Sequence, residues 1–214
     1  METITFEAVP AIIKAAKIFT AKSKSRGVMQ GIHFSKTGDI VAGNGHAMFI
    51  AKQAFVVPPN FKGITAKPEQ NITIGKDCKI CTVCLYDGDK SYIRIGNSLV
   101  SLTLMDGQYG DYENCIPDYH ARTGRSTYYR FESCLLSMAL SALPTQHGVD
   151  IHLGTSTDLM IVKSKAWESV TVAILPMKNT GIENYDIEDA RTHHRLQNTA
   201  GQKRKVDTNT ADWN

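Results

Sequence analysis

The chain has 214 residues, 42% hydrophobic and 21% charged, which is typical of a globular protein that can bury a proper core. Its net charge of +3 is too small to argue for or against nucleic acid, so the placement of the charges must decide. No apolar run approaches the ~20 residues that span a bilayer, and the N-terminus lacks a signal-peptide pattern. We therefore expect a cytoplasmic protein, and the odd count of five cysteines argues against a disulfide framework.

The first quarter of the chain predicts a strand, a helix and three further strands. Residues 3–6 alternate as a strand does. Apolar residues then recur at helical spacing over residues 9–19, with Pro10 in the first turn, where its missing N–H costs nothing. A small, polar and basic loop is predicted at residues 21–27. Three strands joined by glycine-containing turns at Gly38 and at Gly43-Asn44-Gly45 are predicted next, over residues 31–34, 40–43 and 46–51.

The middle of the chain is less regular. Residues 60–70 carry Pro, Gly and Asn without a clear period, so they predict a loop or a poorly formed helix. An irregular connector is expected at residues 106–117, with a polar loop after it at residues 118–126. Between these two regions, four strands with hairpin-type turn residues among them are predicted at residues 72–74, 80–86, 92–95 and 99–104.

The last third repeats the order of elements seen at the start. A strand at residues 127–131 leads into a helix at residues 132–143, which Pro144 ends. Phe131-Glu132 opens this helix as Phe6-Glu7 opens the first one, which indicates two copies of one strand–helix–three-strand unit. The three following strands are predicted at residues 149–153, 159–162 and 170–175, and a polar, largely disordered tail is expected at residues 179–214.

Four segments, in order, resemble the bacterial DNA polymerase III beta sliding clamp family. The corner Asn44-Gly45-His46-Ala47-Met48 is similar to that family's Thr-Asp-Gly-His-Arg-Leu corner. Residues 29–34 resemble the strand that leaves the first helix of the clamp. Residues 105–112, with Ile116-Pro117, resemble the linker between the second and third clamp domains, and residues 173–177 resemble the Met-Pro-Met segment that ends the clamp chain. The resemblance covers residues 1–178.

The resemblance implies an α+β fold of the DNA-clamp (processivity) type, with repeated strand–helix–three-strand units, sheets outside and helices inside. The chain is shorter than a three-domain clamp. One interpretation is a clamp-like domain at residues 1–113 with a degenerate second helix, a second, shortened unit at 114–178 and the tail at 179–214. The other is a single clamp domain with residues 53–126 inserted. Asn44, Ala47 and Gly110 replace the family's Asp, Arg and Pro, and a reduced phage or plasmid form would fit.

The implied function is that of a processivity factor, a homo-oligomeric ring that encircles duplex DNA and tethers a DNA polymerase. Clamp rings total six domains, so two shortened domains favour a trimer and one enlarged domain a hexamer. The alternative is a clamp-like interaction module of a phage or plasmid replication system that forms no ring. The DNA-facing charges would come from one helix face and the basic loop, although a solvated helix face explains them too: Lys14, Lys17, Lys22, Lys24 and Arg26.

The second implied site is a hydrophobic pocket that receives a short peptide from a polymerase or a clamp loader. Methionine suits such a pocket because its flexible thioether can repack around different ligands. Ordinary core packing is the competing explanation for these residues. The positions that match the family's pocket are Met29, Gly43, Gly45, His46, Met48, Cys115, Leu175, Pro176 and Met177.

The sequence offers little chemistry beyond these two sites. The spacing Cys78-x-x-Cys81-x-x-Cys84 suggests a zinc or iron–sulfur site, but on a strand Cys81 faces away from the other two, so the three cannot converge. We therefore predict no metal and no cofactor. There is no phosphate-binding loop, no Gly-x-Ser-x-Gly and no His-Glu-x-x-His motif, so we do not expect an enzyme.

Overall fold

The computed structural model describes residues 3–86, 90–115, 131–144, 148–153 and 159–177, which belong to one compact unit. The expected polar loop at 118–126, most of the strand at 127–131 and the expected tail lie outside the described residues. No helix in the described part is long and apolar enough to cross a membrane. The elements are β1 (Ile4–Ala8), α1 (Pro10–Ile18), the 3-10 helix η1 (Lys24–Gln30), β2 (Ile32–Phe34), β3 (Ile40–Gly43), β4 (Ala47–Ala51), β5 (Ile64–Pro68), β6 (Cys81–Leu85), β7 (Tyr92–Ile95), β8 (Ser98–Met105), α2 (Ser133–Ala142), β9 (Val149–His152), β10 (Met160–Ser164) and β11 (Trp167–Ile174).

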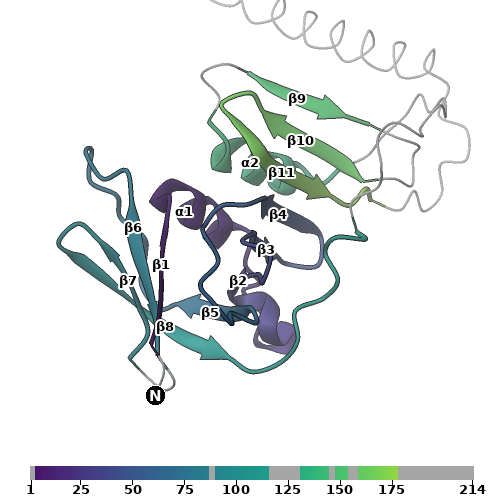
Figure 1. Cartoon of the computed structure of the whole chain (residues 1–214). Coiled ribbons are helices and arrows are strands. Elements are labelled where there is room, and N and C mark those ends of the chain that lie inside the picture. Colours follow the sequence, from purple (N-terminus) through teal and green to yellow (C-terminus); the bar gives the residue numbers. More distant parts are fainter. Residues whose placement is uncertain (1–2, 87–89, 116–130, 145–147, 154–158, 178–214) are drawn as a thin grey trace, which may run out of the picture. The chain divides into compact units, whose positions relative to one another are not determined.

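The strands form one antiparallel sheet in the order β1-β6-β7-β8-β5-β2-β3-β4-β11-β10-β9 (Figure 1). Three repeats supply them: β1, α1 and β2–β4; then β5–β8; then α2 and β9–β11. Strand β8 bends between two partners, because its first half pairs with β7 and its second half with β5. Strand β11 pairs with β4 and so joins the third repeat to the first. The fold is α+β, as the sequence predicts.

Both helices pack on the same side of the sheet and bury its core. Helix α1 packs on β2, β3 and β4, and α2 packs beside α1 and on β11. The apolar spacing that predicts α1 places Ile13 and Ala16 fully in the core. Phe19, which caps the C-terminus of α1, is also fully buried, and its ring lies 5.6 Å from that of Phe49 on β4. Burying a phenylalanine of this kind stabilises a fold by about 1.5–3 kcal/mol.

The opposite side of the sheet carries a smaller apolar cluster of Val41, Ile50 and Tyr112, with Met48 and Tyr109 packed against it. The two tyrosines belong to the irregular connector at residues 106–115, hereafter the linker, which was expected from the sequence. Met48 alternates along β4 with residues of the helix-side core, so its side chain faces away from the helices. The linker therefore covers the sheet face that the helices leave open.

The two predicted turns before and after β3 are confirmed. Gly38 has a φ of +86°, and a Cβ added there would lie 2.7 Å from the backbone oxygen of Phe55. Gly45 has a φ of +87°. In that second turn the Asn44 side-chain oxygen accepts hydrogen bonds from the backbone N–H groups of His46 and Ala47, both at 2.9 Å. Such bonds to the chain ahead are why asparagine favours turns.

Three sequence-based predictions are wrong. Residues 60–70 are not a loop or helix throughout, because β5 forms there between β2 and β8. Residues 72–74 form no strand, although Ile72 is buried. Part of the expected loop at 21–27 is η1, which Ser23 caps by accepting a hydrogen bond from the N–H of Ser25. Each segment is too short for periodicity to decide its structure, and for residues 64–68 the pairing with β2 and β8 decides instead.

Candidate functional site

A broad groove of about 1220 Å³ lies on the helix side of the sheet, with α1 on one wall and α2 on the other. Four of the five cations predicted to face DNA line it, namely Lys14, Lys17, Lys22 and Arg26. Lys24 is exposed on η1 and does not line it. The structure therefore brings together cations from a helix and from the segment after it, as the sequence suggests.

The groove has a one-sided distribution of charge. Helix α2 contributes the small polar side chains of Cys134, Ser137 and Ser141 beside the apolar Leu135 and Met138, and among the described residues no carboxylate lines the groove. Lys17 donates a hydrogen bond to the backbone oxygen of Gln70, and burial lowers the pKa of this lysine while the nearby Glu69 carboxylate opposes the change. Glu132 also lies beside the groove, since its carboxylate accepts a hydrogen bond from Cys134 at 3.0 Å. A concave surface whose own lining carries cations and no carboxylate of the described residues attracts anionic ligands.

A second cavity, of about 460 Å³, lies on the other side of the sheet, where β4, β11 and the linker meet. Its lining is mainly apolar, and Met48 and Ala173 sit opposite each other across the β4–β11 pair. Pro176 and Met177 do not line the cavity, and Met177 is 42% exposed. Seven of the nine positions predicted for the pocket do line it: Met29, Gly43, Gly45, His46, Met48, Cys115 and Leu175.

The pocket also contains residues that sequence reasoning missed. Tyr109 and Tyr112 form its linker wall, and only the resemblance of the linker to the clamp family could have indicated them. The Tyr109 ring stacks on His33, with centroids 4.8 Å apart and planes 10° apart. Burial raises the pKa of Tyr109, whose hydroxyl lies beside Gly43 without a hydrogen bond to any described residue. The other missed lining residues are Ala47, Gly110, Asp111, Leu159 and Ala173.

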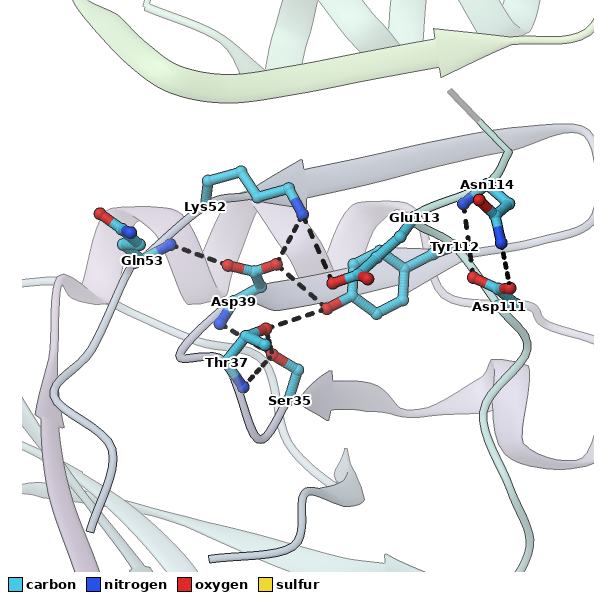
Figure 2. Close-up of polar contacts among 9 residues, drawn as sticks. All are labelled: Ser35, Thr37, Asp39, Lys52, Gln53, Asp111, Tyr112, Glu113 and Asn114. Carbon is cyan, nitrogen blue, oxygen red and sulfur yellow. Dashed lines mark hydrogen bonds and ion pairs between the residues drawn. The ribbon is translucent and has the colours of Figure 1, made fainter. Parts of the chain in front are cut away.

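A buried carboxylate fixes the linker to the sheet (Figure 2). Asp39, directly before β3, accepts hydrogen bonds from Lys52 Nζ at 2.8 Å, the backbone N–H of Gln53 at 2.9 Å and the Tyr112 hydroxyl at 3.0 Å. Burial alone would raise the pKa of Asp39, but these hydrogen bonds outweigh it and hold the pKa below its usual value. Lys52 also lies 3.9 Å from Glu113 of the linker.

The same contacts tie a turn to the linker. The Tyr112 hydroxyl lies 3.4 Å from the Thr37 hydroxyl in the turn between β2 and β3, and Ser35 holds that turn through the backbone N–H groups of Thr37 and Asp39. Figure 2 shows Lys52 and Tyr112 pointing toward the Asp39 carboxylate, with Thr37 beside the Tyr112 hydroxyl. We call Asp39, Lys52 and Tyr112 the linker latch. It sets the position of the pocket wall that Tyr109 and Tyr112 form.

The groove and the pocket meet at the corner between β3 and β4. His46 lines both cavities. The guanidinium of Arg26, a groove residue, lies so close to Gly45 that an added Cβ would be 2.7 Å from its Nη1 atom. The corner at residues 44–48 thus lies between the charged groove and the mainly apolar pocket.

The cysteine triplet forms no metal site among the described residues, where no cluster of three His, Cys, Asp or Glu side chains is placed to hold an ion. Cys81 lies in β6 and donates a hydrogen bond to the backbone oxygen of Ala8, and burial raises its pKa to about 12. Cys78 precedes the strand and donates to the backbone oxygen of Ile80. Cys84, three residues after Cys81 on β6, lies 4.0 Å from the Thr5 hydroxyl.

No protein-family model matches the chain, and no curated protein matches it in sequence. Several solved structures share its fold. The DNA polymerase III beta subunit of Borrelia burgdorferi is 15% identical with a TM-score of 0.61, over 83% of this chain and 63% of that one. The DNA polymerase sliding clamp of Pseudomonas aeruginosa is 14% identical with a TM-score of 0.60, over 82% of this chain and 66% of that one.

The sliding clamp of Bacillus subtilis is similar to the same degree, with 12% identity and a TM-score of 0.60 over 83% of this chain and 65% of that one. The chain thus spans slightly less than two thirds of the length of these proteins. At such low identity the likeness demonstrates the sliding-clamp fold, and the function has to be argued from the chain's own surfaces.

Proposed function

We propose that the chain is a DNA sliding clamp, a non-enzymatic processivity factor that encircles duplex DNA as a homo-oligomeric ring and tethers a DNA polymerase in the cytoplasm. The observation that carries the proposal is the placement of two chemically opposite cavities on a clamp fold. In the part of the chain that the structure describes, the groove on the helix side is lined by four cations and no carboxylate, and the pocket on the other side is mainly apolar.

The groove suits the DNA backbone. A clamp holds DNA by enclosure, so it needs no base-specific contacts and only a cationic lining that slides along phosphates. Lys14, Lys17, Lys22 and Arg26 supply that lining in this proposal, and Lys24 adds charge beside it. Serines on the α2 wall can donate hydrogen bonds to phosphate oxygens without adding charge.

The pocket suits an apolar peptide of the polymerase or of a clamp loader. A volume of about 460 Å³ accommodates a few large side chains, and its methionines can repack around them. Tyr109 and Tyr112 form a wall held by the linker latch, so the pocket is formed before the ligand arrives. Asp111 and His46 at its lining can contact the polar backbone of a bound peptide.

Strand pairing supports the domain interpretation with a clamp-like first domain at residues 1–113, whose second helix is degenerate, and a shortened second unit at 114–178, followed by a tail at 179–214. Strands β5–β8 lie between β1 and β2 in the sheet, and β1 pairs with β6. An insertion at residues 53–126 would be separable from its host domain, whereas these strands are interleaved with the first repeat. Residues 69–80, where a second helix would fall, contain none.

The second candidate is a clamp-like interaction module, of a shortened phage or plasmid type, that forms no ring. It is favoured by the missing helix of the second repeat and by the absence of Lys and Arg from α2. If the chain instead forms a ring, its two domains per chain require a trimer to reach the six domains of a clamp ring. Light scattering separates the candidates, because a strict monomer at micromolar concentration would contradict a ring.

The DNA contact is tested by the salt dependence of binding to a short labelled duplex, measured by fluorescence anisotropy. The wild-type chain is compared with a variant in which Lys14, Lys17, Lys22 and Arg26 are alanine. Neutralising four phosphate contacts makes the slope of log K against log salt shallower by about 3.6, so the wild type loses roughly a hundredfold more affinity than the variant between about 50 and 200 mM salt.

The matched control replaces four exposed cations that line neither cavity: Lys36, Lys62, Lys90 and Arg94. It removes the same charge, so any effect of net charge alone appears in both variants. Equal slopes for the two variants would overturn the assignment of the groove to DNA.

A further inference from the structure

The two walls of the apolar pocket differ in charge. The linker contains three carboxylates, Asp106, Asp111 and Glu113, and no Lys, Arg or His. On the corner wall, the guanidinium of Arg26 lies against Gly45, although Arg26 itself lines the groove. Among the described residues that line the pocket there is no Lys or Arg, and Asp111 is the only carboxylate. The negative charge of the pocket therefore lies on its linker wall.

The charge of Asp111 is not balanced by a cation. Its carboxylate accepts two hydrogen bonds from Asn114, at 3.3 Å from the backbone N–H and at 2.6 Å from the side-chain amide (Figure 2). Both donors are neutral, and Asp111 forms no ion pair with any described residue. Asp39 and Glu113, in contrast, lie 2.8 and 3.9 Å from Lys52. Asp111 is thus the carboxylate of this region that is left to attract a cation from outside the chain.

The end of the linker holds the Asp111 side chain in place. Asn114 donates to both carboxylate oxygens, and the Cys115 thiol donates to the backbone oxygen of Asp111 at 3.1 Å. The next residue, Tyr112, is fixed to the sheet by the linker latch. The carboxylate is exposed but already ordered, so a ligand that pairs with it loses less side-chain entropy than two free side chains would.

We propose that the pocket selects peptides in which Arg or Lys lies close in sequence to a large apolar residue. The apolar side chain fills the cavity beside Met48 and Leu175, and the cation pairs with Asp111. Residues two positions apart lie on the same side of an extended peptide, so one short segment can make both contacts. Arg suits this role best because its guanidinium can donate two parallel hydrogen bonds to a carboxylate. This inference rests on the proposed function, since it names the chemistry of the peptide that the pocket receives.

The same charges keep the ligands of the two cavities apart. The cations of the groove repel a cationic peptide, and Asp111 repels the phosphates of DNA. Opposite charges on neighbouring cavities therefore direct each ligand to its own site. Such charges contribute more to specificity than to affinity, so the apolar contacts still supply most of the binding free energy of the peptide.

Three labelled octapeptides test the proposal. They share the same leucines and phenylalanine and differ only in carrying Arg, Gln or Glu on both sides of these residues. Fluorescence anisotropy measures their binding to the full chain without DNA, at about 50 mM salt and about pH 8, where an ordinary histidine is neutral. We expect the Arg peptide to bind roughly fivefold more tightly than the Glu peptide, with the Gln peptide between them. The difference should shrink at about 500 mM salt, because ions screen an exposed ion pair.

Substitution of Asp111 tests whether this carboxylate sets the preference. In Asp111→Asn the ratio of the Kd values of the Glu and Arg peptides should fall from roughly five to about one, because the charge is lost while the size is kept. Asp111→Glu retains the charge and should retain part of the preference. The matched control is Asp77→Asn, which removes an exposed carboxylate that lines neither cavity. It should keep the wild-type ratio.

Leu175→Gln separates a failure of this inference from a failure of the proposed pocket. It makes the pocket more polar without adding charge, so all three peptides should bind more weakly. If it does weaken them but the wild-type chain binds all three equally, or binds the Glu peptide most tightly, the pocket receives peptides and this inference is wrong. Full preference in Asp111→Asn would also overturn it. If Leu175→Gln changes none of the affinities, the pocket is not the peptide site and both proposals are wrong.

Discussion

The two sides of the sheet differ in how their cavities are built. The cationic residues of the groove come from one continuous stretch, residues 14–26, whereas the pocket combines the β3–β4 corner, the linker and the end of β11. A site made from one stretch depends on local helix geometry. A site made from three distant stretches depends on the whole sheet being in register. Here the buried Asp39 carboxylate holds the linker in place through its hydrogen bond from Tyr112.

The largest expected effect separates the pocket from the groove. Leu175→Glu places a charge in the apolar pocket at a side chain that is 46% exposed, so folding should survive. We expect a labelled octapeptide containing two leucines and a phenylalanine to lose roughly a hundredfold in affinity, or about 2.7 kcal/mol, because the peptide must bury beside the charge. Fluorescence anisotropy of the labelled peptide measures this affinity. Duplex affinity should stay the same.

The matched control for the pocket is Leu99→Glu, which adds the same charge at an exposed leucine outside both cavities. Met48→Glu is a second pocket variant and should behave like Leu175→Glu. If Leu175→Glu and Leu99→Glu bind the peptide equally well, the cavity is not the peptide site. The proposal that the two sides of the sheet bind different ligands would then be wrong.

A smaller effect should appear when the weaker wall of the groove is made cationic. Ser137→Lys with Ser141→Lys adds two charges on α2, where the chain has none. We expect the slope of log K against log salt to steepen by about 1.8. When the salt is lowered from about 200 to 50 mM, the duplex affinity of the variant should therefore rise roughly tenfold more than that of the wild type. The same titration with Ser98→Lys and Ser101→Lys on β8 provides the control. If the α2 variant and the β8 control give equal slopes, DNA does not bind in the groove.

The pH dependence of folding should report on the pocket wall. Burial lowers the pKa of His33, which stacks on Tyr109, to about 4 from an ordinary value of 6.5. The folded chain therefore favours neutral His33, so this contribution is complete above about pH 6.5 and is lost as the pH falls towards about 4. His33 is only partly buried, so we expect a loss of about 1–2 kcal/mol in the free energy of unfolding.

Urea denaturation at several pH values measures the His33 effect. Asp39 has a pKa below its usual value, and its contribution also falls as acid protonates it, so the wild-type curve contains both effects. Subtracting the curve of His33→Gln isolates the histidine. A constant difference between the two curves from pH 7 to pH 4 would contradict the assignment.

The smallest expected effect comes from loosening the linker latch. Tyr112→Phe removes the hydroxyl that donates to Asp39 and keeps the ring, so the free energy of unfolding should fall by about 1 kcal/mol. Peptide affinity should weaken a few-fold because the pocket wall is less fixed, while duplex binding stays constant. Tyr92→Phe, on β7 outside both cavities, is the control. Unchanged peptide affinity in Tyr112→Phe would show that the latch stabilises the fold without positioning the pocket.

Local pattern in the sequence was enough for the elements whose residues repeat regularly or whose turns need particular residues. The apolar spacing of α1 and α2, the two-residue turn between β7 and β8, and the glycines at Gly38 and Gly45 all led to correct predictions. The clustering of cations between residues 14 and 26 was equally local, which is why four of the five line one groove. Helical spacing and turn chemistry act over a few residues, so the sequence alone expresses them.

Tertiary structure alone decided the features that depend on distant partners. Residues 64–68 become a strand because β2 and β8 both offer pairing edges, although Pro68 and a short, irregular pattern argue otherwise. The pairing of β1 with β6, the junction of β4 with β11 and the hydrogen bond from Tyr112 to Asp39 join residues more than 30 positions apart. Pairing edges and burial are properties of the assembled sheet, and no local window of sequence contains them.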